Sequence, residues 1–249
     1  MKKGILIIGM MALCVSLSFA QTEKNEYDMK GKKQGNWEEK VDKNTIMKGW
    51  YKDGEKIGAW ASFQPSGKLT KIESYVDGKR NGILVAFDNN AYPSEIKYYK
   101  DDLLDGISTE YQSNRVVTEI SYINGVEHGI KKRYYLTGKK REETTMADGL
   151  RNGVAKWYDE SEQVTAEYNY SKGELNGEQK TFYVSGAIRT KETYINGKQT
   201  GEALEYFEDG AIKRKGGFNK NGEKDGDWVE FDQTGKKIKT DKYKAGTLQ

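Results

Sequence analysis

Few residues of this chain have types and spacings that could do chemistry. Among 249 residues there is one histidine, His128, and one cysteine, Cys14. Nucleophilic catalysis by a serine or cysteine needs a histidine or another base beside the nucleophile, and a zinc site needs several imidazole or thiolate ligands. His128 occupies a column of a repeating pattern, described below, in which Gln34, Ile57 and Asn81 also stand. A catalytic base is not expected in such a column, so we predict an exposed turn histidine.

Carboxylates are abundant, and a glycosidase-like pair of them is the remaining catalytic possibility. The candidates are Asp101 with Asp102, and the cluster of Glu223, Asp225 and Asp227. Asp102, however, stands where the repeats carry a glycine, and Asp225 stands in the same column as His128. The acidic cluster also lacks the loop spacing of an EF-hand. The sequence therefore predicts structural roles for these carboxylates, no cofactor, no metal and no enzymatic activity.

The element that must position all these residues is a repeat of 23 to 25 residues. A leading glycine, or its stand-in, recurs at Gly31, Gly54, Gly78, Asp102, Gly125, Gly149, Gly173, Gly197, Gly222 and Gly246. A second glycine follows four residues after each of the first nine positions. A fixed period of this size indicates an array of small units, each of which is stable only against its neighbours. Nine units fill residues 31–249, which leaves no room for another domain.

Each repeat carries two turn signals and therefore predicts two strands. One signal precedes the second glycine, as in Asn81-Gly82 and Asp105-Gly106, and is typical of a tight hairpin. The other lies within the unit, as in Ser66-Gly67 and Ser185-Gly186. The stretches between them have strand length and are rich in Tyr, Thr, Val and Ile. The prediction is an all-β fold: an elongated antiparallel meander of about eighteen strands in nine hairpin repeats.

Side chains alternate between the two faces of a strand, so positions one, three and five after the second glycine share a face. The fifth position is aromatic in eight units: Phe63, Phe87, Tyr111, Tyr134, Tyr158, Phe182, Tyr206 and Phe231. A second aromatic column stands three residues before the leading glycine: Tyr51, Tyr75, Tyr99, Tyr122, Tyr170, Tyr194 and Tyr243. We expect these two columns to pair across strands in one ladder along the array. Lys40 interrupts the first column, which predicts a degenerate capping unit at that end.

The other face carries Trp60, Leu84, Trp157 and Trp228 among charged residues. Isolated tryptophans flanked by charges suit contact with a protein or a glycan, and these four form the candidate interaction face. The alternative is that they pack on neighbouring hairpins.

The pattern of two glycines, a tryptophan, an aromatic, a turn glycine and a tyrosine resembles the bacterial variant of the MORN repeat, as in YwqK-type antitoxin-repeat proteins. Its best copies begin at Gly58 and Gly226, and the resemblance covers almost the whole chain after residue 30. It implies β-hairpins that add into one long twisted sheet. It further implies binding of protein or lipid rather than catalysis.

The first twenty residues have the three parts of an export signal. Lys2 and Lys3 precede an apolar run, and Ser18-Phe19-Ala20 supplies small residues for cleavage before Gln21. A membrane anchor is the alternative. We therefore divide the chain into a signal peptide at 1–20, a short lead at 21–30 and the repeat array at 31–249. The expected location is periplasmic, cell-surface or secreted.

Charge and context narrow the expected partners. Without Lys2 and Lys3 the chain has 39 basic and 38 acidic residues, so no nucleic-acid partner is expected. We expect an unidentified protein partner and a role as a scaffold or adaptor at the cell envelope. Two alternatives stay open: an antitoxin-like or immunity-like protein, which export would restrict to toxins acting outside the cytoplasm, and a module that binds lipid or glycan. The array is expected to be a monomer or a weak end-to-end dimer, because its terminal strands are unpaired.

Overall fold

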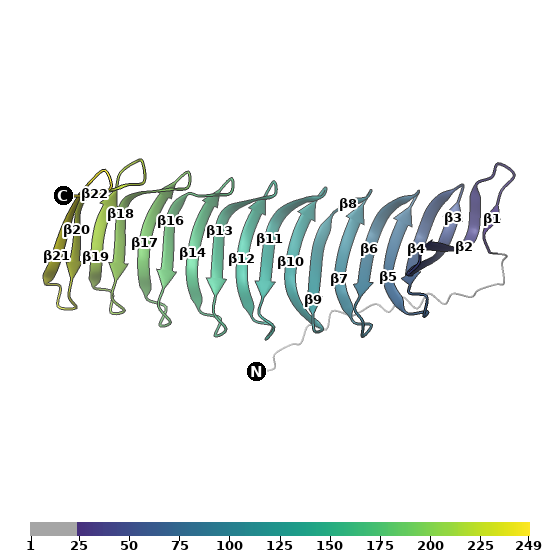
Figure 1. The fold of residues 1–249 in the computed structure, drawn as a ribbon, viewed down its shortest axis with the longest axis horizontal. Coiled ribbons are helices and arrows are strands. Elements are labelled where there is room, and N and C mark those ends of the chain that lie inside the picture. Colours follow the sequence, from purple (N-terminus) through teal and green to yellow (C-terminus); the bar gives the residue numbers. More distant parts are fainter. Residues whose placement is uncertain (1–23) are drawn as a thin grey trace, which may run out of the picture.

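A computed structural model describes residues 24–249 as one open antiparallel sheet without helices, in which the strands follow one another in chain order (Figure 1). The strands are β1 (Glu26–Tyr27), β2 (Lys33–Asp42), β3 (Thr45–Lys52), β4 (Glu55–Phe63), β5 (Leu69–Val76), β6 (Lys79–Phe87), β7 (Pro93–Lys100), β8 (Leu103–Leu104), β9 (Gly106–Gln112), β10 (Arg115–Ile123), β11 (Val126–Tyr134), β12 (Lys140–Ala147), β13 (Leu150–Tyr158), β14 (Val164–Ser171), β15 (Glu174–Leu175), β16 (Gly177–Phe182), β17 (Ile188–Ile195), β18 (Lys198–Tyr206), β19 (Ile212–Phe218), β20 (Lys224–Phe231), β21 (Lys237–Lys244) and β22 (Thr247–Leu248). The predicted all-β meander is confirmed.

Eighteen of these 22 strands have six or more residues, and the other four have two. The short strands β8 and β15 each form the start of a repeat. In these two repeats the strand pairing is interrupted at the residue before the second glycine, which separates a two-residue strand from the longer strand that follows. The lead also belongs to the sheet, because Glu26 and Tyr27 pair with Gln34 and Lys33. The proposed signal peptide, residues 1–20, lies outside the described residues.

Two-residue hairpin turns lie at eight of the ten leading positions, and the prediction that placed the turns between units at the second glycine and the residue before it is wrong. Pairs of consecutive residues with positive φ, as a type I′ turn requires, occur at Asp77-Gly78 and even at Asp101-Asp102, where neither residue is glycine. The second glycine instead lies inside a strand. Gly82 has a φ of 104° within β6, where the register between β5 and β6 shifts as in a bulge. Asn81 does not share the positive φ, so the dipeptide forms a bulge and not a turn.

Hydrogen bonds join each tight turn to the preceding hairpin. The N–H of Gly125 donates to the carbonyl of Leu104 at 2.7 Å, and equivalent bonds recur at six other leading glycines and at Asp102. The column of His128 adds side-chain bonds: the carboxylate of Asp105 accepts the N–H of Asn124, and that of Asp225 accepts the N–H of Ala245. The Asx residues before the second glycines therefore hold the next turn in place.

The two aromatic columns lie on opposite faces of the sheet, so the predicted joint ladder is wrong. Tyr51 pairs with Lys56, which lies two residues before Gly58 and so shares a face with Trp60. Cross-strand partners point to the same side, and this places the tyrosine column beside the tryptophans. Phe63 and its equivalents point the other way. The observed aromatic contacts agree, since Tyr51 meets Trp37 and Trp60 edge to face.

We call the side that carries Trp37, Trp60, Trp157 and Trp228 the tryptophan face, and the opposite side the aliphatic face. Seventeen described residues are buried, and all but Val229 are on the tryptophan face. The core of this single-layer protein is therefore a strip of side chains packed along one face.

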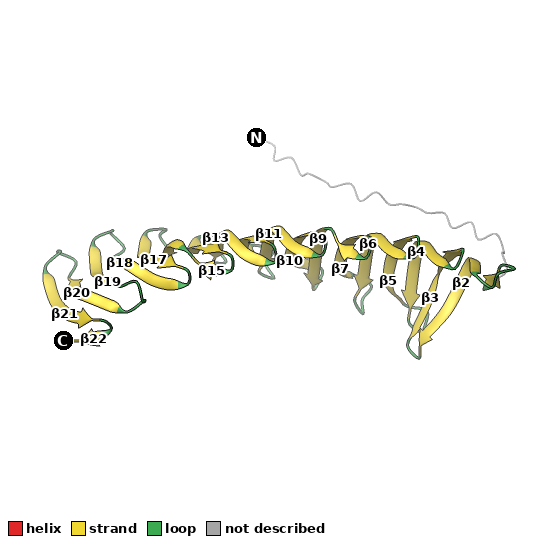
Figure 2. Cartoon of the chain, turned by 90° about the horizontal axis from the view of Figure 1, so that it is seen from above, coloured by secondary structure: helices red, strands yellow, loops and turns green. Residues whose placement is uncertain are grey.

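No second layer of residues 24–249 covers either face, and the sheet twists gradually from one end to the other (Figure 2). Residues 24–249 contain no helix that could span a membrane.

Candidate functional site

The structure buries most of the predicted interaction face. Trp60 has no exposed surface, and Leu84 and Trp228 are 6% and 7% exposed. Trp157 is partly buried. These side chains pack on neighbouring hairpins, as the alternative interpretation expected, so a partner cannot touch Trp60 directly. Whether the tryptophan face as a whole binds a partner stays a prediction.

Glycines on adjacent strands make this packing possible. A Cβ atom on Gly49 would lie 2.3 Å from the indole of Trp60, and one on Gly216 would lie 2.1 Å from that of Trp228. Each indole N–H donates to a backbone carbonyl: Trp60 to Trp50, and Trp228 to Gly217. Burying these rings therefore leaves no unpaired indole donor.

Sequence reasoning missed one member of the buried column. Trp37 stands two residues after Gly35, as Trp60 stands after Gly58, and it is 5% exposed. Its ring contacts Tyr27 and Tyr51 edge to face. The signal was present in the alignment of repeats. Lys40 breaks the aromatic column in this unit, but Gly35 and Trp37 keep the rest of the pattern.

Cations on the same face lie over the aromatic rings. The Lys56 Nζ is 4.2 Å from the Trp60 ring centre, and the Lys224 Nζ is 4.5 Å from that of Trp228. Arg80 lies over Tyr99 in the same way, at 4.2 Å. These residues stand two positions before the second glycine, a column that also supplies Lys33 and Arg151 to neighbouring rings. The exposed part of this face is consequently polar.

The fifth-position aromatics, Phe63, Phe87, Tyr111, Tyr134, Tyr158, Phe182, Tyr206 and Phe231, are all half-buried on the aliphatic face. They contact charged residues of the adjacent strands, as Lys48 contacts Phe63 and Lys215 contacts Phe231. The hydroxyl of Tyr134 donates to the carboxylate of Glu119 at 2.6 Å. Burial and this carboxylate both raise the pKa of Tyr134. These residues are structural, as the repeat pattern indicated.

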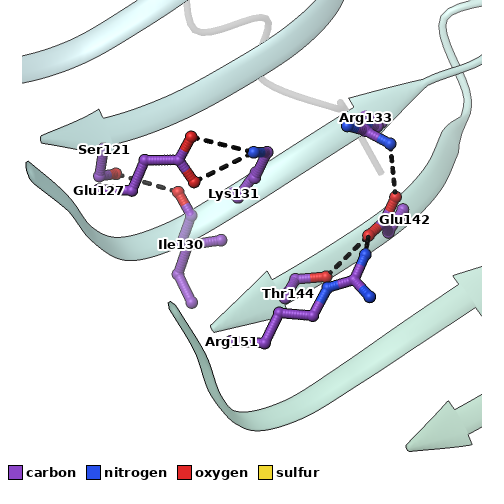
Figure 3. A network of polar contacts seen from close by, with 8 residues as sticks. All are labelled: Ser121, Glu127, Ile130, Lys131, Arg133, Glu142, Thr144 and Arg151. Atoms are coloured by element: carbon purple, nitrogen blue, oxygen red, sulfur yellow. Dashed lines mark hydrogen bonds and ion pairs between the residues drawn. The ribbon is translucent and has the colours of Figure 1, made fainter. Parts of the chain in front are cut away.

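The middle of the tryptophan face holds a buried carboxylate between two arginines (Figure 3). Glu142 is 6% exposed and accepts bonds from Arg133 at 3.4 Å, from Arg151 at 3.3 Å and from the hydroxyl of Thr144 at 3.0 Å. The nearby pair of Lys131 and Glu127 is separate from it. Both arginines keep about 40% of their side chains exposed. Because the carboxylate is fully bonded, this network orders the central repeats and presents no free acid or base.

The other chemistry-bearing residues also have structural positions. His128 is exposed on β11. Asp102 accepts bonds from the N–H and the guanidinium of Arg80, which lower the pKa of Asp102. Glu223 accepts a bond from the side chain of Asn219. Within residues 24–249 no three His, Cys, Asp or Glu side chains gather closely enough to hold a metal ion.

One shallow depression opens on the tryptophan face at Ala203, a small residue in the position that Trp60 and Trp228 occupy in other repeats. It has a volume of about 240 Å³, and its lining includes Ala203, Phe218, Trp228, Arg214 and Glu192. Arg214 lies over the ring of Trp228 at 5.0 Å. Opposite charges line the depression together, and this mixture does not select one ligand charge.

An extended exposed apolar surface lies on the aliphatic face, where sequence reasoning placed no site. We call it the aliphatic patch and define it by Ile83, Tyr98, Leu103, Ile107, Ile123, Val126, Ile130, Leu150 and Val154, which are 36–53% exposed. It extends from β6 to β13. Its two main rows stand one position after the leading glycine and one position after the second glycine.

The same two rows become charged beyond the patch. After Leu150 and Val154 the next repeat has Glu174 and Glu178, and the one after it has Lys198 and Glu202. The patch is therefore a local departure from a polar pattern. The sequence shows this change in the residues one position after each leading and each second glycine.

Two adjacent repeats match a known family. Residues 127–148 and 151–172 match the model of the MORN repeat variant. These segments include most of β11 to β14, the Glu142 network and, from the aliphatic patch, Ile130 and Val154. No curated protein matches the chain. The match supports a repeat module of a kind often involved in binding.

Proposed function

We propose that this chain is a non-enzymatic, exported scaffold that binds another protein surface through the aliphatic patch. The observation that carries the proposal is the exposure of nine large apolar side chains on one uncovered face, in two rows that become charged towards the C-terminal end. Nine half-exposed side chains present roughly 700 Å² of apolar surface, at the upper end of what monomeric proteins expose and typical of an interaction site.

The architecture favours binding over catalysis. The array offers an extended, regular surface, as repeat proteins that bind along their length do. The candidate carboxylates Asp102 and Glu223 accept bonds within the array, the histidine is exposed, and the depression beside Trp228 is shallow. The likeness of the repeat pattern to YwqK-type antitoxin-repeat proteins supports the same class of function.

Capture from native envelope fractions tests the proposal. The double variant Ile107→Glu/Ile130→Glu puts two charges into the patch without touching the buried column. Ile238→Glu is the matched control, since Ile238 is 62% exposed on β21, away from the patch. We expect a protein that wild type and the control capture, and that the double variant loses. Equal capture by all three would contradict the proposal.

Export has its own test. N-terminal sequencing of the protein recovered outside the cytoplasm should begin at Gln21. Recovery of the intact N-terminus in the cytoplasm would contradict export but leave the binding surface unaffected.

A further inference from the structure

We propose that the occupant of the aliphatic patch is a second copy of this chain, packed face to face with the two arrays running in opposite directions. This inference rests on the proposed function, because it names the partner of the same surface. The arrangement is a two-layered sandwich in the centre of the molecule, formed about a two-fold axis parallel to the strands near β10 and β11.

The first support is shape and position. The patch is made of two rows parallel to the long axis of the array, Leu103, Val126 and Leu150 near the tight turns, and Ile107, Ile130 and Val154 further along the strands. A rotation about an axis parallel to the strands reverses the order of the repeats but keeps each row at its distance from the turns. Each row then meets the same row of the second copy. Two sheets pack in this way when apolar residues from both inner faces interdigitate.

The second support is area. The roughly 700 Å² that the patch presents is close to the ~800 Å² per partner of a standard interface, so that a pair buries about what a stable dimer needs. The contact would be isologous, as two-fold interfaces are.

The third support is charge. Lys79 stands in the first row one repeat before Leu103, and Glu174 stands in it one repeat after Leu150; both are exposed. Reversing the order of the repeats about Val126 places Lys79 of one copy opposite Glu174 of the other. A parallel arrangement would bring like charges together. The pattern of charges therefore selects the antiparallel pairing.

The ends of the array favour this contact over end-to-end association. The terminal strand β21 carries Lys237, Lys239, Lys242 and Lys244. Lysines on an edge strand oppose pairing with another edge, and the short β22 already bonds to β21.

Sedimentation velocity of the purified protein over a range of concentrations tests the inference. We expect a dimer for wild type and for Ile238→Glu, and at least tenfold weaker association for Ile107→Glu/Ile130→Glu. Circular dichroism should show that all three keep the same sheet content. A monomeric wild type, or a dimer that persists in the double variant, would overturn the inference.

Charge reversal tests the antiparallel arrangement. Lys79→Glu and Glu174→Lys should each weaken self-association, whereas an equimolar mixture of the two should form a heterodimer. The combined variant Lys79→Glu/Glu174→Lys should dimerise again, because its two borders are complementary once more. Failure of both the mixture and the combined variant to associate would overturn this geometry.

The two proposals can fail separately. If the protein is a monomer but captures a different protein through Ile107 and Ile130, self-association is overturned and the scaffold proposal is supported. If vesicles of anionic phospholipid bind wild type but not Ile107→Glu/Ile130→Glu, the occupant of the patch is a membrane surface, and both proposals are overturned.

Discussion

The indole ring of Trp60 lies directly over Gly49 on the neighbouring strand, and Trp228 lies over Gly216 in the same way near the other end of the array. Both glycines have ordinary backbone conformations, since neither has a positive φ. They are required because a side chain there would occupy the volume of the ring.

Gly216→Ala should therefore destabilise the protein by about 1–3 kcal/mol, as overpacking of a filled site does. Gly217→Ala is the matched control, because its Cβ would meet only backbone oxygens at 3.5 Å and 3.6 Å. Urea unfolding followed by tryptophan fluorescence measures both variants. Equal stability of the two would mean that the contact between Trp228 and Gly216 does not restrict the site.

Glu142 should matter more to stability than its sequence neighbour. Glu142→Ala removes the common partner of Arg133, Arg151 and Thr144, and we expect a loss of about 1–3 kcal/mol. Glu143→Ala removes only a bond from Lys140 on the more exposed aliphatic face, with an expected loss of at most about 1 kcal/mol. Chemical denaturation of both variants measures the two losses of unfolding free energy. A larger loss for Glu143→Ala would contradict the central role of Glu142.

Lys172 offers a stabilising substitution. It has a φ of 49° at the first position of a tight turn, where four other turns have Asp, two have Asn and one has Ala. Asn adopts this conformation more readily than Lys, so Lys172→Asn should stabilise by roughly 0.5 kcal/mol. Lys198→Asn is the control, since Lys198 is exposed but lies outside the positive-φ positions. A thermal melt in which both variants behave alike would refute this explanation.

Alkaline pH should weaken the fold through buried tyrosines. Burial, assisted by the carboxylate of Glu73, raises the pKa of Tyr75 from 10.0 to about 12. The folded state thus prefers the neutral phenol: its contribution to stability is complete below pH 10.0 and is lost as pH rises towards about 12. Urea unfolding across this window should show a steeper loss for wild type than for Tyr75→Phe. Identical slopes would mean that Tyr75 ionises as freely when folded as when unfolded.

The repeat length, the all-β meander and the positions of both aromatic columns follow from the sequence, because glycine spacing and strand alternation are local properties. The pairing of the columns does not. It depends on which residues face each other across a turn, and Asn81-Gly82 resembles a hairpin turn in sequence although it forms a bulge. Placing the turn at Asp77-Gly78 instead moves Tyr75 to the side of the tryptophans.

The candidate site was predicted less well than the fold. Tryptophans flanked by charges look similar in sequence whether they are buried or exposed, and the difference for Trp60 is made by Gly49 on another strand. The aliphatic patch depends on the opposite property: its members are ordinary strand residues whose exposure follows only from the lack of a second layer. Composition alone cannot show which face of a single sheet remains uncovered.

The bonds between each tight turn and the preceding hairpin have a consequence for the evolution of the chain. Because every repeat contacts only its neighbours, loss or duplication of one whole unit preserves all the remaining junctions and changes only the distance between the two ends. A single inserted residue within a strand would instead exchange the two faces from that point on. Changes in gene length are therefore expected in multiples of the repeat, and the molecule's span is a property that selection can adjust without redesigning its interior.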